Sequence, residues 1–479
     1  MSPVLADPAP VRAAMAALEM SSRVEPNEKI DLDRVFFPHS HRNVLDARRQ
    51  LVVGNRGMGK SFWTHALTNR EVRDRLASTY GFPALATTDV VIGFNGSEKA
   101  SPQTPTIDEV QAADRTGSDP GLIWRASILR AVRSLSQTPT SWMQSVEELL
   151  RNPATYAAEL SKIDDLHESQ GRHLLVVFDA LDRLALDWAL IRKLTKGLLL
   201  TVLGLQSFSR IRAKVFMRAD QFADPELFRF PDGSKLRNDR VDLTWQPHEL
   251  YGLLLFELLR QDTSATALRG IARELDAEAA LPVMGSARLN PQKQESLISG
   301  IAGEFMGKGA KRGRVYSWVP LHLGDAAKNC SPRTFLTAWK TAAAHDPAPA
   351  ILVVDHLGLN EGVRQASSTR LAELREDYPW IGLALEPLRR QFVPIEKLEL
   401  FELWQSRRVT QRILENATRE QWLPPIGIVI EDTPEALLRT MTSIAVMEER
   451  ANGKINVPDI FRVEAGILRK GGVAVPRRA

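Results

Sequence analysis

Cysteine is almost missing from this sequence of 479 residues, in which Cys330 stands alone. A single cysteine cannot form an intrachain disulfide, and it excludes a zinc site built from several cysteines. No apolar run reaches the roughly 18 residues that a membrane-spanning helix needs. The start of the chain also lacks the basic residues and the long apolar middle of a signal peptide. We therefore expect a cytoplasmic protein without a membrane segment.

An excess of charge of one sign is missing too, because 62 basic residues stand against 58 acidic ones. The C-terminal tail is the exception, since Glu464 is its only acidic residue among five basic ones: Arg462, Arg469, Lys470, Arg477 and Arg478. Two interpretations remain open for this tail. It is either a solvated end of the chain, or a contact for nucleic acid or an acidic partner.

The chain is too long for one hydrophobic core, because single cores stop growing at roughly 250–300 residues. Apolar strand patterns alternate with helical patterns through the first half, and no internal repeat is visible. This alternation predicts an α/β fold with a parallel sheet. The expected strands cover residues 50–53, 89–94, 174–178, 214–217 and 241–243.

We expect four segments along the chain. Residues 1–45 form a lead-in, and residues 46–245 form the sheet domain, with a helical insert at about 100–170. Residues 246–345 form a helical lid, and residues 346–479 form a helical segment and a winged-helix-like C-terminal domain. In that last domain Thr433 is expected to cap a helix, and Asn452-Gly453 is expected to turn a hairpin.

The strongest motif follows the first expected strand and matches G-x-x-x-x-G-K-[ST] at every fixed position. Its glycines allow backbone N–H groups to ring phosphates, and the helix that follows adds positive potential. The lysine is expected to reach the β- and γ-phosphates of ATP, and the serine is expected to bind Mg²⁺. The expected nucleotide-binding residues are Gly54, Asn55, Arg56, Gly57, Met58, Gly59, Lys60, Ser61 and Phe62.

Two carboxylates follow the apolar strand 174–178, in Asp179-Ala180-Leu181-Asp182-Arg183. Asp179 ends the strand, where a carboxylate can hold Mg²⁺ directly or through water. Asp182 is our candidate for the residue that orients or deprotonates the attacking water. The alternative for Asp182 is a helix N-cap or an ion-pair partner of Arg183.

Two arginines are candidate sensors of the γ-phosphate. Arg218 ends the strand 214–217, and the carboxyl ends of parallel strands face the ligand crevice. Its alternative is an ion pair with Asp220. Arg333 lies in the first turn of a helix that Ser331 is expected to cap, where a cation is unfavourable unless an anion lies nearby. Its alternative is an ordinary surface residue.

Together these motifs resemble the additional-strand branch of P-loop NTPases, which includes AAA+, STAND and KAP ATPases. Asp179 to Arg183 is similar to the Asp-x-Leu-Asp-Arg signature of KAP ATPases and to the Asp-Gly-Leu-Asp-Glu signature of NACHT-type STAND proteins. Arg218 resembles a sensor-1 arginine, and Ser331-Pro332-Arg333 resembles the sensor-2 motif of origin-recognition-type AAA+ lids. The order of motifs, the segment 452–459 and the end of the chain also resemble uncharacterised bacterial ATPases of mobile and defence islands.

Two functions follow from these motifs and that resemblance. The first is an ATP-binding and hydrolysing switch that signals to a partner protein or effector, in bacterial defence for example. The second is a DNA-handling ATPase of the initiator or transposition type that uses a C-terminal winged helix. The resemblance implies a homo-oligomer or a hetero-complex. A small-molecule kinase would need a second substrate pocket, for which no motif is present, and a GTPase would need an Asn-Lys-x-Asp motif that is missing.

Overall fold

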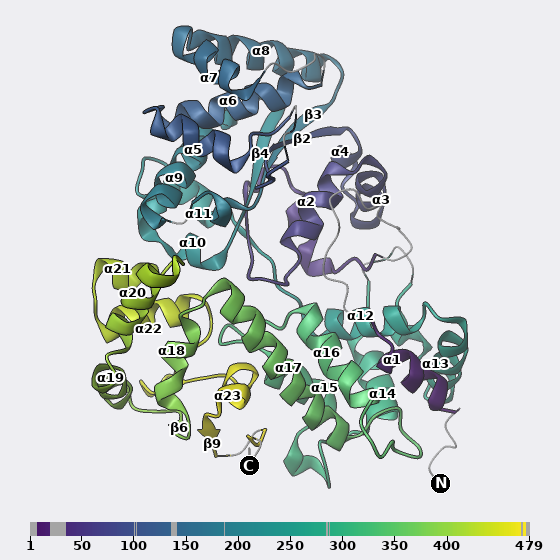
Figure 1. Ribbon diagram of the computed structural model, residues 1–479. Coiled ribbons are helices and arrows are strands. Elements are labelled where there is room, and N and C mark those ends of the chain that lie inside the picture. Colours follow the sequence, from purple (N-terminus) through teal and green to yellow (C-terminus); the bar gives the residue numbers. More distant parts are fainter. Residues whose placement is uncertain are drawn as a thin grey trace. The chain divides into compact units, whose positions relative to one another are not determined.

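The computed structural model describes residues 7–19, 35–99, 101, 103–135, 141–185, 187–283, 286, 288–470 and 473–475. The chain divides into two compact units (Figure 1). One unit is Val24–Leu243, and the other combines Met1–Arg23 with Thr244–Ala479. Parts of the expected lead-in, and Arg477 and Arg478 of the basic tail, lie outside the described residues.

A five-stranded parallel sheet forms the centre of the unit Val24–Leu243, as the strand pattern predicts. Its strands stand in the order β2-β3-β4-β1-β5, and β3 is buried along almost its whole length. The strands are β1 (Leu51–Val53), β2 (Thr88–Phe94), β3 (His173–Phe178), β4 (Ile211–Met217) and β5 (Val241–Asp242).

The position of β4 defines the class of sheet. This strand pairs with β1 on one side, where Val53 faces Met217, and with β3 on the other, where Phe178 faces Val215. One strand is therefore added between the strand before the glycine-rich loop and the strand that ends at Asp179. This is the additional-strand arrangement that the motifs imply.

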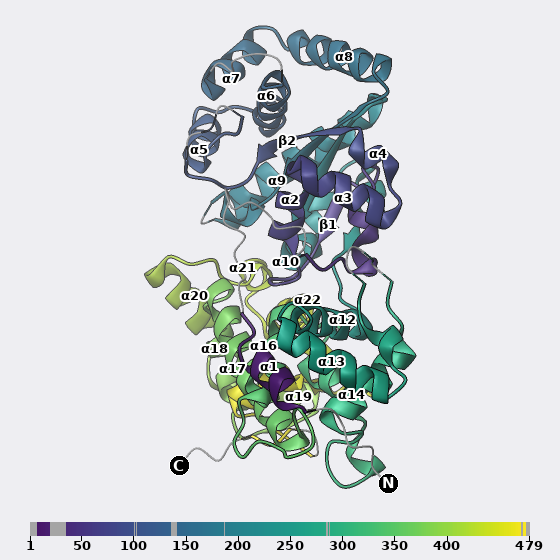
Figure 2. The same cartoon turned by 90° about the vertical axis from the view of Figure 1, so that its right-hand side faces the viewer.

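Ten helices of this unit are described, and they are joined by four short 3-10 segments. The helices are α2 (Lys60–Thr68), α3 (Arg70–Tyr80), α4 (Pro83–Ala86), α5 (Ile107–Arg115), α6 (Pro120–Arg133), α7 (Trp142–Arg151), α8 (Ala154–Ser169), α9 (Trp188–Gly204), α10 (Ala219–Ala223) and α11 (Gly233–Asn238). The 3-10 segments are η2 (His39–Leu45), η3 (Leu181–Arg183), η4 (Leu205–Ser207) and η5 (Pro225–Phe228). Figure 2 shows that α5 to α8, between β2 and β3 in sequence, group together at one end of this unit.

A buried tryptophan fixes this helical group to the sheet. The ring of Trp124 on α6 contacts Phe94 of β2 and Phe178 of β3 edge-on, at centroid distances of 5.7 and 5.9 Å. Its indole N–H donates to the carbonyl of Leu194 on α9 over 2.7 Å, so the polar atom of a fully buried ring is satisfied. The insert is therefore packed into the core of the sheet domain.

The second unit is mainly helical and includes one helix from the start of the chain. Its longer helices are α1 (Ala9–Ala16), α12 (Pro247–Leu258), α13 (Asp262–Glu274), α14 (Pro291–Ala302), α15 (Val315–Leu323), α16 (Pro332–Ala343), α17 (His356–Asp377), α19 (Lys397–Ser406), α20 (Val409–Glu420) and α22 (Pro434–Ser443). The shorter segments are α18 (Ile381–Leu385), α21 (Ile426–Ile430), α23 (Asp459–Ala465), η6 (Glu278–Ala280), η7 (Ala310–Arg312) and η8 (Glu386–Leu388).

Helix α1 packs against α13 and α16, although more than 200 residues separate them in sequence. Its apolar face is fully buried at Val11 and Met15. Arg12 extends from the same helix and donates to the carbonyls of Val353, at 2.8 Å, and of Pro349 and Leu352. Apolar burial and a bonded guanidinium together make α1 part of this core.

The C-terminal residues form the helix and hairpin that the sequence predicts. Thr433 caps α22, and the antiparallel strands β7 (Glu448–Glu449) and β8 (Ile455–Asn456) follow, with Gly453 in the turn at φ +77°. The domain is therefore winged-helix-like. A second small sheet was not expected: β6 (Phe392–Val393) pairs in parallel with β9 (Leu468–Arg469). Within the described ranges, no helix is long and apolar enough to cross a membrane.

Candidate functional site

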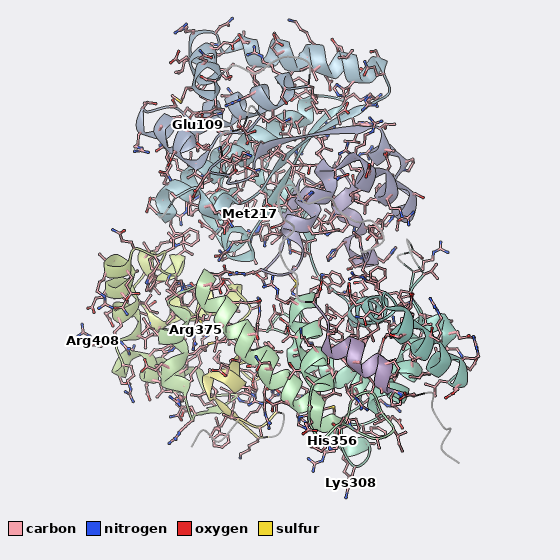
Figure 3. The ribbon with its side chains drawn as sticks, turned by 45° about the vertical axis from the view of Figure 1, so that its right-hand side comes forward. Glu109, Met217, Lys308, His356, Arg375 and Arg408 are labelled. Atoms are coloured by element: carbon pink, nitrogen blue, oxygen red, sulfur yellow. The ribbon has the colours of Figure 1, made fainter. Side chains whose placement is uncertain are left out.

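The glycine-rich loop Gly54–Ser61 runs from the end of β1 into α2, as its motif predicts. Gly57 and Gly59 have φ values of +82° and +108°, a region that side chains rarely adopt. Gly54 donates its N–H to the carbonyl of Met217, which ends β4 and is labelled in Figure 3. The loop therefore has the strand before it, the helix after it and the backbone turns that a phosphate cradle needs.

Lys60 begins α2 and curls back along its own loop. Its ammonium donates to the carbonyl of Gly54 at 2.6 Å and to that of Asn55 at 3.2 Å. Burial lowers the pKa of Lys60 from its ordinary value, against the opposing effect of the nearby Asp179 and Asp182. Its head group thus already lies at the loop whose N–H groups would hold phosphate.

Asp179 lies directly after β3, and both of its oxygens have donors. Thr64 on α2 donates from Oγ1 to Oδ2 at 3.0 Å, and the N–H of Ala180 donates to Oδ1 at 2.7 Å. Burial raises the pKa of this carboxyl, while the two hydrogen bonds and Lys60 lower it. Ser61, the other expected metal ligand, is the second residue of the same helix and is exposed.

The turn after Asp179 has an unusual backbone. Ala180 adopts φ +58°, a left-handed conformation that costs an L-residue about 1–2 kcal/mol. The 3-10 turn η3 begins at the next residue and carries Asp182. Gly96 of the loop after β2 lies so close that an added Cβ would approach that of Ala180 to 2.8 Å. Close packing against Gly96 therefore restrains Ala180, the residue at which the chain turns toward Asp182.

The guanidinium of Arg218 bridges two carboxylates, those of Asp220 and Asp182. Nε and Nη2 donate to the two oxygens of Asp220, each at 3.1 Å, and Nη1 donates to Asp182 at 3.2 Å. The pairing with Asp220 that was the alternative for Arg218 is therefore present. The guanidinium also reaches Asp182, which follows β3, whereas Arg218 and Asp220 follow β4. Asp182 thus pairs with Arg218, and Arg183 is exposed.

Arg333 lies in the second unit, in the first turn of α16, which Ser331 caps as predicted. The anion that this position requires is Glu373 of α17, which Arg333 contacts through Nη1 at 2.5 Å. Arg370 also donates to Glu373, at 3.3 Å. Arg333 is therefore a half-buried member of an Arg-Glu-Arg cluster between two helices of its own unit.

The structure thus brings four of the predicted residues together: Lys60, Asp179, Asp182 and Arg218. It also adds two residues that the sequence analysis does not name, Thr64 and Trp63, beside the Asp220 that was the alternative partner of Arg218. Thr64 and Asp220 contact the site directly, and Trp63 lies beneath the loop, 3.8 Å from the position of an added Cβ on Gly59. Trp63 is fixed by a hydrogen bond from its indole N–H to Nδ1 of His41, at 2.9 Å. Among the described residues, no group of three or more His, Cys, Asp or Glu side chains is arranged to hold a metal ion.

Comparison with known proteins gives structural matches of low similarity. No family model matches the sequence, and no curated protein matches it. Among solved structures, the Aeropyrum pernix ORC2 protein, determined as ADPNP-ADP complexes, aligns with 92% of this chain and 93% of its own. Its sequence identity is 14% and the TM-score is 0.36. CDC6P from Pyrobaculum aerophilum aligns over 93% of both chains, with 11% identity and a TM-score of 0.29.

Fold and site together define the class of protein. A parallel sheet with one strand between β1 and β3, a glycine-rich loop with a half-buried lysine, and a carboxylate after β3 constitute a P-loop NTPase core. The residues present suit a magnesium nucleotide, since the loop backbone offers donors, and Asp179 and Ser61 offer oxygen ligands.

Proposed function

We propose that this chain binds and hydrolyses Mg-ATP at the site formed by Lys60, Asp179, Asp182 and Arg218. The observation that carries the proposal is the hydrogen bond between Thr64 and Asp179, which ties the helix of the phosphate loop to the end of β3. That bond places a half-buried carboxylate near the loop lysine, an arrangement that suits a magnesium nucleotide.

Each residue has a distinct part in this proposal. Lys60 exchanges its two loop carbonyls for phosphate oxygens, and the N–H groups of Gly57 and Gly59 donate to the same anion. Ser61 and Asp179 hold Mg²⁺, which neutralises charge that develops on the phosphates. Asp182 accepts a proton from the attacking water or orients it, and Arg218 holds Asp182 in position.

Nucleotide titration tests the proposal. Lys60→Ala should remove most of the ATP affinity while the domain stays folded, because the ammonium bonds to loop carbonyls and fills no apolar core. Thermal unfolding followed by circular dichroism checks the fold of the variant. Equal ATP affinities of wild type and variant would sink the proposal.

We further propose that ATP works as a switch, read by a partner protein or effector, within a homo-oligomer or a hetero-complex. Arg333 is the proposed sensor on the helical lid, residues 246–345. Two charge-assisted contacts to the γ-phosphate, from Arg218 and Arg333, would supply on the order of 3–6 kcal/mol before desolvation and ordering costs. Glu373 is the carboxylate with which phosphate competes for Arg333.

DNA handling is the second candidate function, and the winged-helix-like end of the chain favours it. Such a domain can place a helix in a DNA groove and a hairpin against the backbone. Salt-dependent DNA binding by the full chain separates this candidate from a switch that is read by protein alone.

A further inference from the structure

A basic loop connects α14 to α15 in the second unit, and the function proposed above gives it no role. It runs from Glu304 to Arg314, and no acidic residue occurs between Phe305 and Gly324. Its basic residues, all exposed, are Lys308, Lys311, Arg312 and Arg314. In Figure 3 the labelled Lys308 lies at the lower edge of its unit, next to the labelled His356.

Backbone hydrogen bonds close this loop on itself. Residues 305 and 314 form an antiparallel bridge at its base, and Met306 donates its N–H to the carbonyl of Gly313 at 2.9 Å. Gly307, Gly309 and Gly313 have φ values of +135°, +86° and +88°, which allow the tight turns. Met306 is buried beneath the loop. The loop is therefore a small folded platform that holds basic side chains outward.

The charges at the outer end of the loop are not neutralised by ion pairs within the part of the chain that the structure describes. Arg314, at the base, pairs with Glu295 and Glu304, both at 3.3 Å. Lys308, Lys311 and Arg312 form no ion pair with any residue that the structure describes. Three like charges on one short loop repel one another, and an external polyanion would relieve that cost.

The hairpin β7–β8 differs from this loop, because its basic side chains have acidic partners. In and around it, Lys454 pairs with Glu396 at 2.7 Å, Lys397 pairs with Glu449 at 3.1 Å and Arg450 lies 3.7 Å from Glu448. The wing that would meet DNA in a winged-helix protein is thus electrostatically satisfied within its own domain. A second surface is needed if this unit is to bind a polyanion strongly.

We propose that the loop 304–314 binds the sugar-phosphate backbone of double-stranded DNA without reading its sequence. The inference rests on the DNA-handling candidate above and adds the surface that makes the contact. Lys and Arg side chains supply many of the phosphate contacts in protein–DNA complexes, and this loop presents both. Its residues include no large exposed apolar side chain, which the core of a protein interface would require.

Duplex DNA fits better than a single strand. Binding to single strands relies on aromatic side chains on which bases stack. The only aromatic residue of the loop is Phe305, and its ring is covered by the guanidinium of Arg314, 5.7 Å from the centroid. The remaining chemistry is charge alone, which tracks the regular phosphates of a duplex.

Anisotropy with a fluorescein-labelled DNA duplex tests the proposal in the full chain, from about 50 to 200 mM salt. The loop variant is Lys308→Gln/Lys311→Gln/Arg312→Gln. The matched control, Arg269→Gln/Arg407→Gln/Arg408→Gln, removes the same charge from exposed positions of the same unit. Three lost phosphate contacts should lower the slope of log K against log salt by about 2–3, and should weaken binding about tenfold or more at 100 mM.

The outcomes are distinguishable. Equal slopes for the loop variant and the control would overturn the loop assignment while leaving DNA handling intact. No DNA binding by wild type removes the DNA candidate together with the loop assignment. Loop-dependent binding of polyglutamate or single-stranded DNA as tight as that of the duplex shows a general polyanion site and overturns the duplex assignment. ATP hydrolysis by the same proteins should be unchanged, and its absence in wild type counts only against the ATPase proposal.

Discussion

Nη1 of Arg218 donates to Oδ2 of Asp182 over 3.2 Å, while the rest of the guanidinium holds both oxygens of Asp220. The contact joins the ends of two neighbouring strands, β3 and β4, on the side where the phosphate loop lies. The guanidinium is held by Asp220 and restrains Asp182. Because its positive charge is shared between the two carboxylates, it does not fully neutralise Asp182. The pair is therefore suited to position the Asp182 carboxylate so that it orients or deprotonates the attacking water.

Replacing Asp182 with Asn should separate binding from turnover. Asn keeps an oxygen that accepts from Arg218 but cannot take a proton, so Mg-ATP affinity should stay nearly the same. Hydrolysis should slow by roughly 10²-fold or more, the usual scale for a lost general base. Single-turnover hydrolysis and nucleotide titration measure the two effects, with the exposed Asp239→Asn as control. A wild-type rate would show that Asp182 is structural.

Thr64→Val tests the link between α2 and Asp179. Valine keeps the shape but removes the donor to Oδ2, leaving the half-buried carboxylate of Asp179 with one fewer hydrogen bond. The loss should cost about 1–3 kcal/mol, and part of it should appear as weaker binding of ATP with Mg²⁺ than of ATP alone. Thr68→Val is the matched control, because Thr68 bonds only to carbonyls of its own helix. Calorimetric titration with and without Mg²⁺ measures the difference, and equal losses in the two variants would contradict the prediction.

Lys214 should make the stability of the sheet domain depend on pH. Its ammonium is fully buried on β4 and donates to the carbonyls of Asp46 and Arg49, at 3.0 and 2.7 Å. Burial lowers the pKa of Lys214 from 10.5 to about 7. Between those pH values the unfolded chain binds a proton that the folded chain does not. The free energy of unfolding should therefore rise with pH across this window, by at most about 1.4 kcal/mol per unit.

Urea unfolding of wild type and Lys214→Met at several pH values measures this contribution. The difference in stability between the two proteins should shift in favour of wild type as the pH rises from 7 toward 10. Groups that titrate equally in both proteins cancel in the difference. A constant difference across the window would show that Lys214 keeps its proton in the folded state.

Arg333→Ala should remove the distinction between ATP and ADP if Arg333 senses the γ-phosphate. A non-hydrolysable analogue should protect residues 245–330 of wild type from limited proteolysis more than ADP does, and the variant should lose that difference. Glu373→Gln is the informative companion, because it removes the ion-pair partner but keeps the arginine. If both variants lose the protection equally, Arg333 acts through its pair with Glu373. If Arg333→Ala keeps full protection, it is no sensor.

The parts of this site that sequence reasoning finds are local in the chain. The phosphate loop is one run of eight residues whose spacing carries its own chemistry, and an apolar strand marks Asp179. Thr64 could not be found in this way, because its role depends on which turn of α2 faces β3, and this is set by tertiary packing. Asp220 was the expected alternative partner of Arg218, but the contact from Arg218 to Asp182 depends on β3 and β4 being neighbours. Thr64 does carry a weak signal, since it lies one helical turn after Lys60.

The fold shows the same division. Hydrophobic patterns predict all five strands of the sheet, because continuous apolar runs are needed where both faces are buried. The pair β6 and β9 has only two residues in each strand, too few to show alternation, and it joins segments about 75 residues apart. The docking of α1 on α13 and α16 could not be predicted either. The sequence of a short alanine-rich helix indicates an apolar face but not the helices that cover it.

The docking of α1 makes the helical unit discontinuous in sequence, with the nucleotide-binding unit inserted between its first helix and the rest. The polypeptide therefore crosses between the units twice, and each crossing is a covalent tether. Fragment work must respect this topology: a piece that begins at Thr244 lacks the apolar face of α1 and leaves the carbonyls of Pro349, Leu352 and Val353 without their arginine. Supplying residues 1–23 as a separate peptide should restore that fragment, in the manner of a split protein.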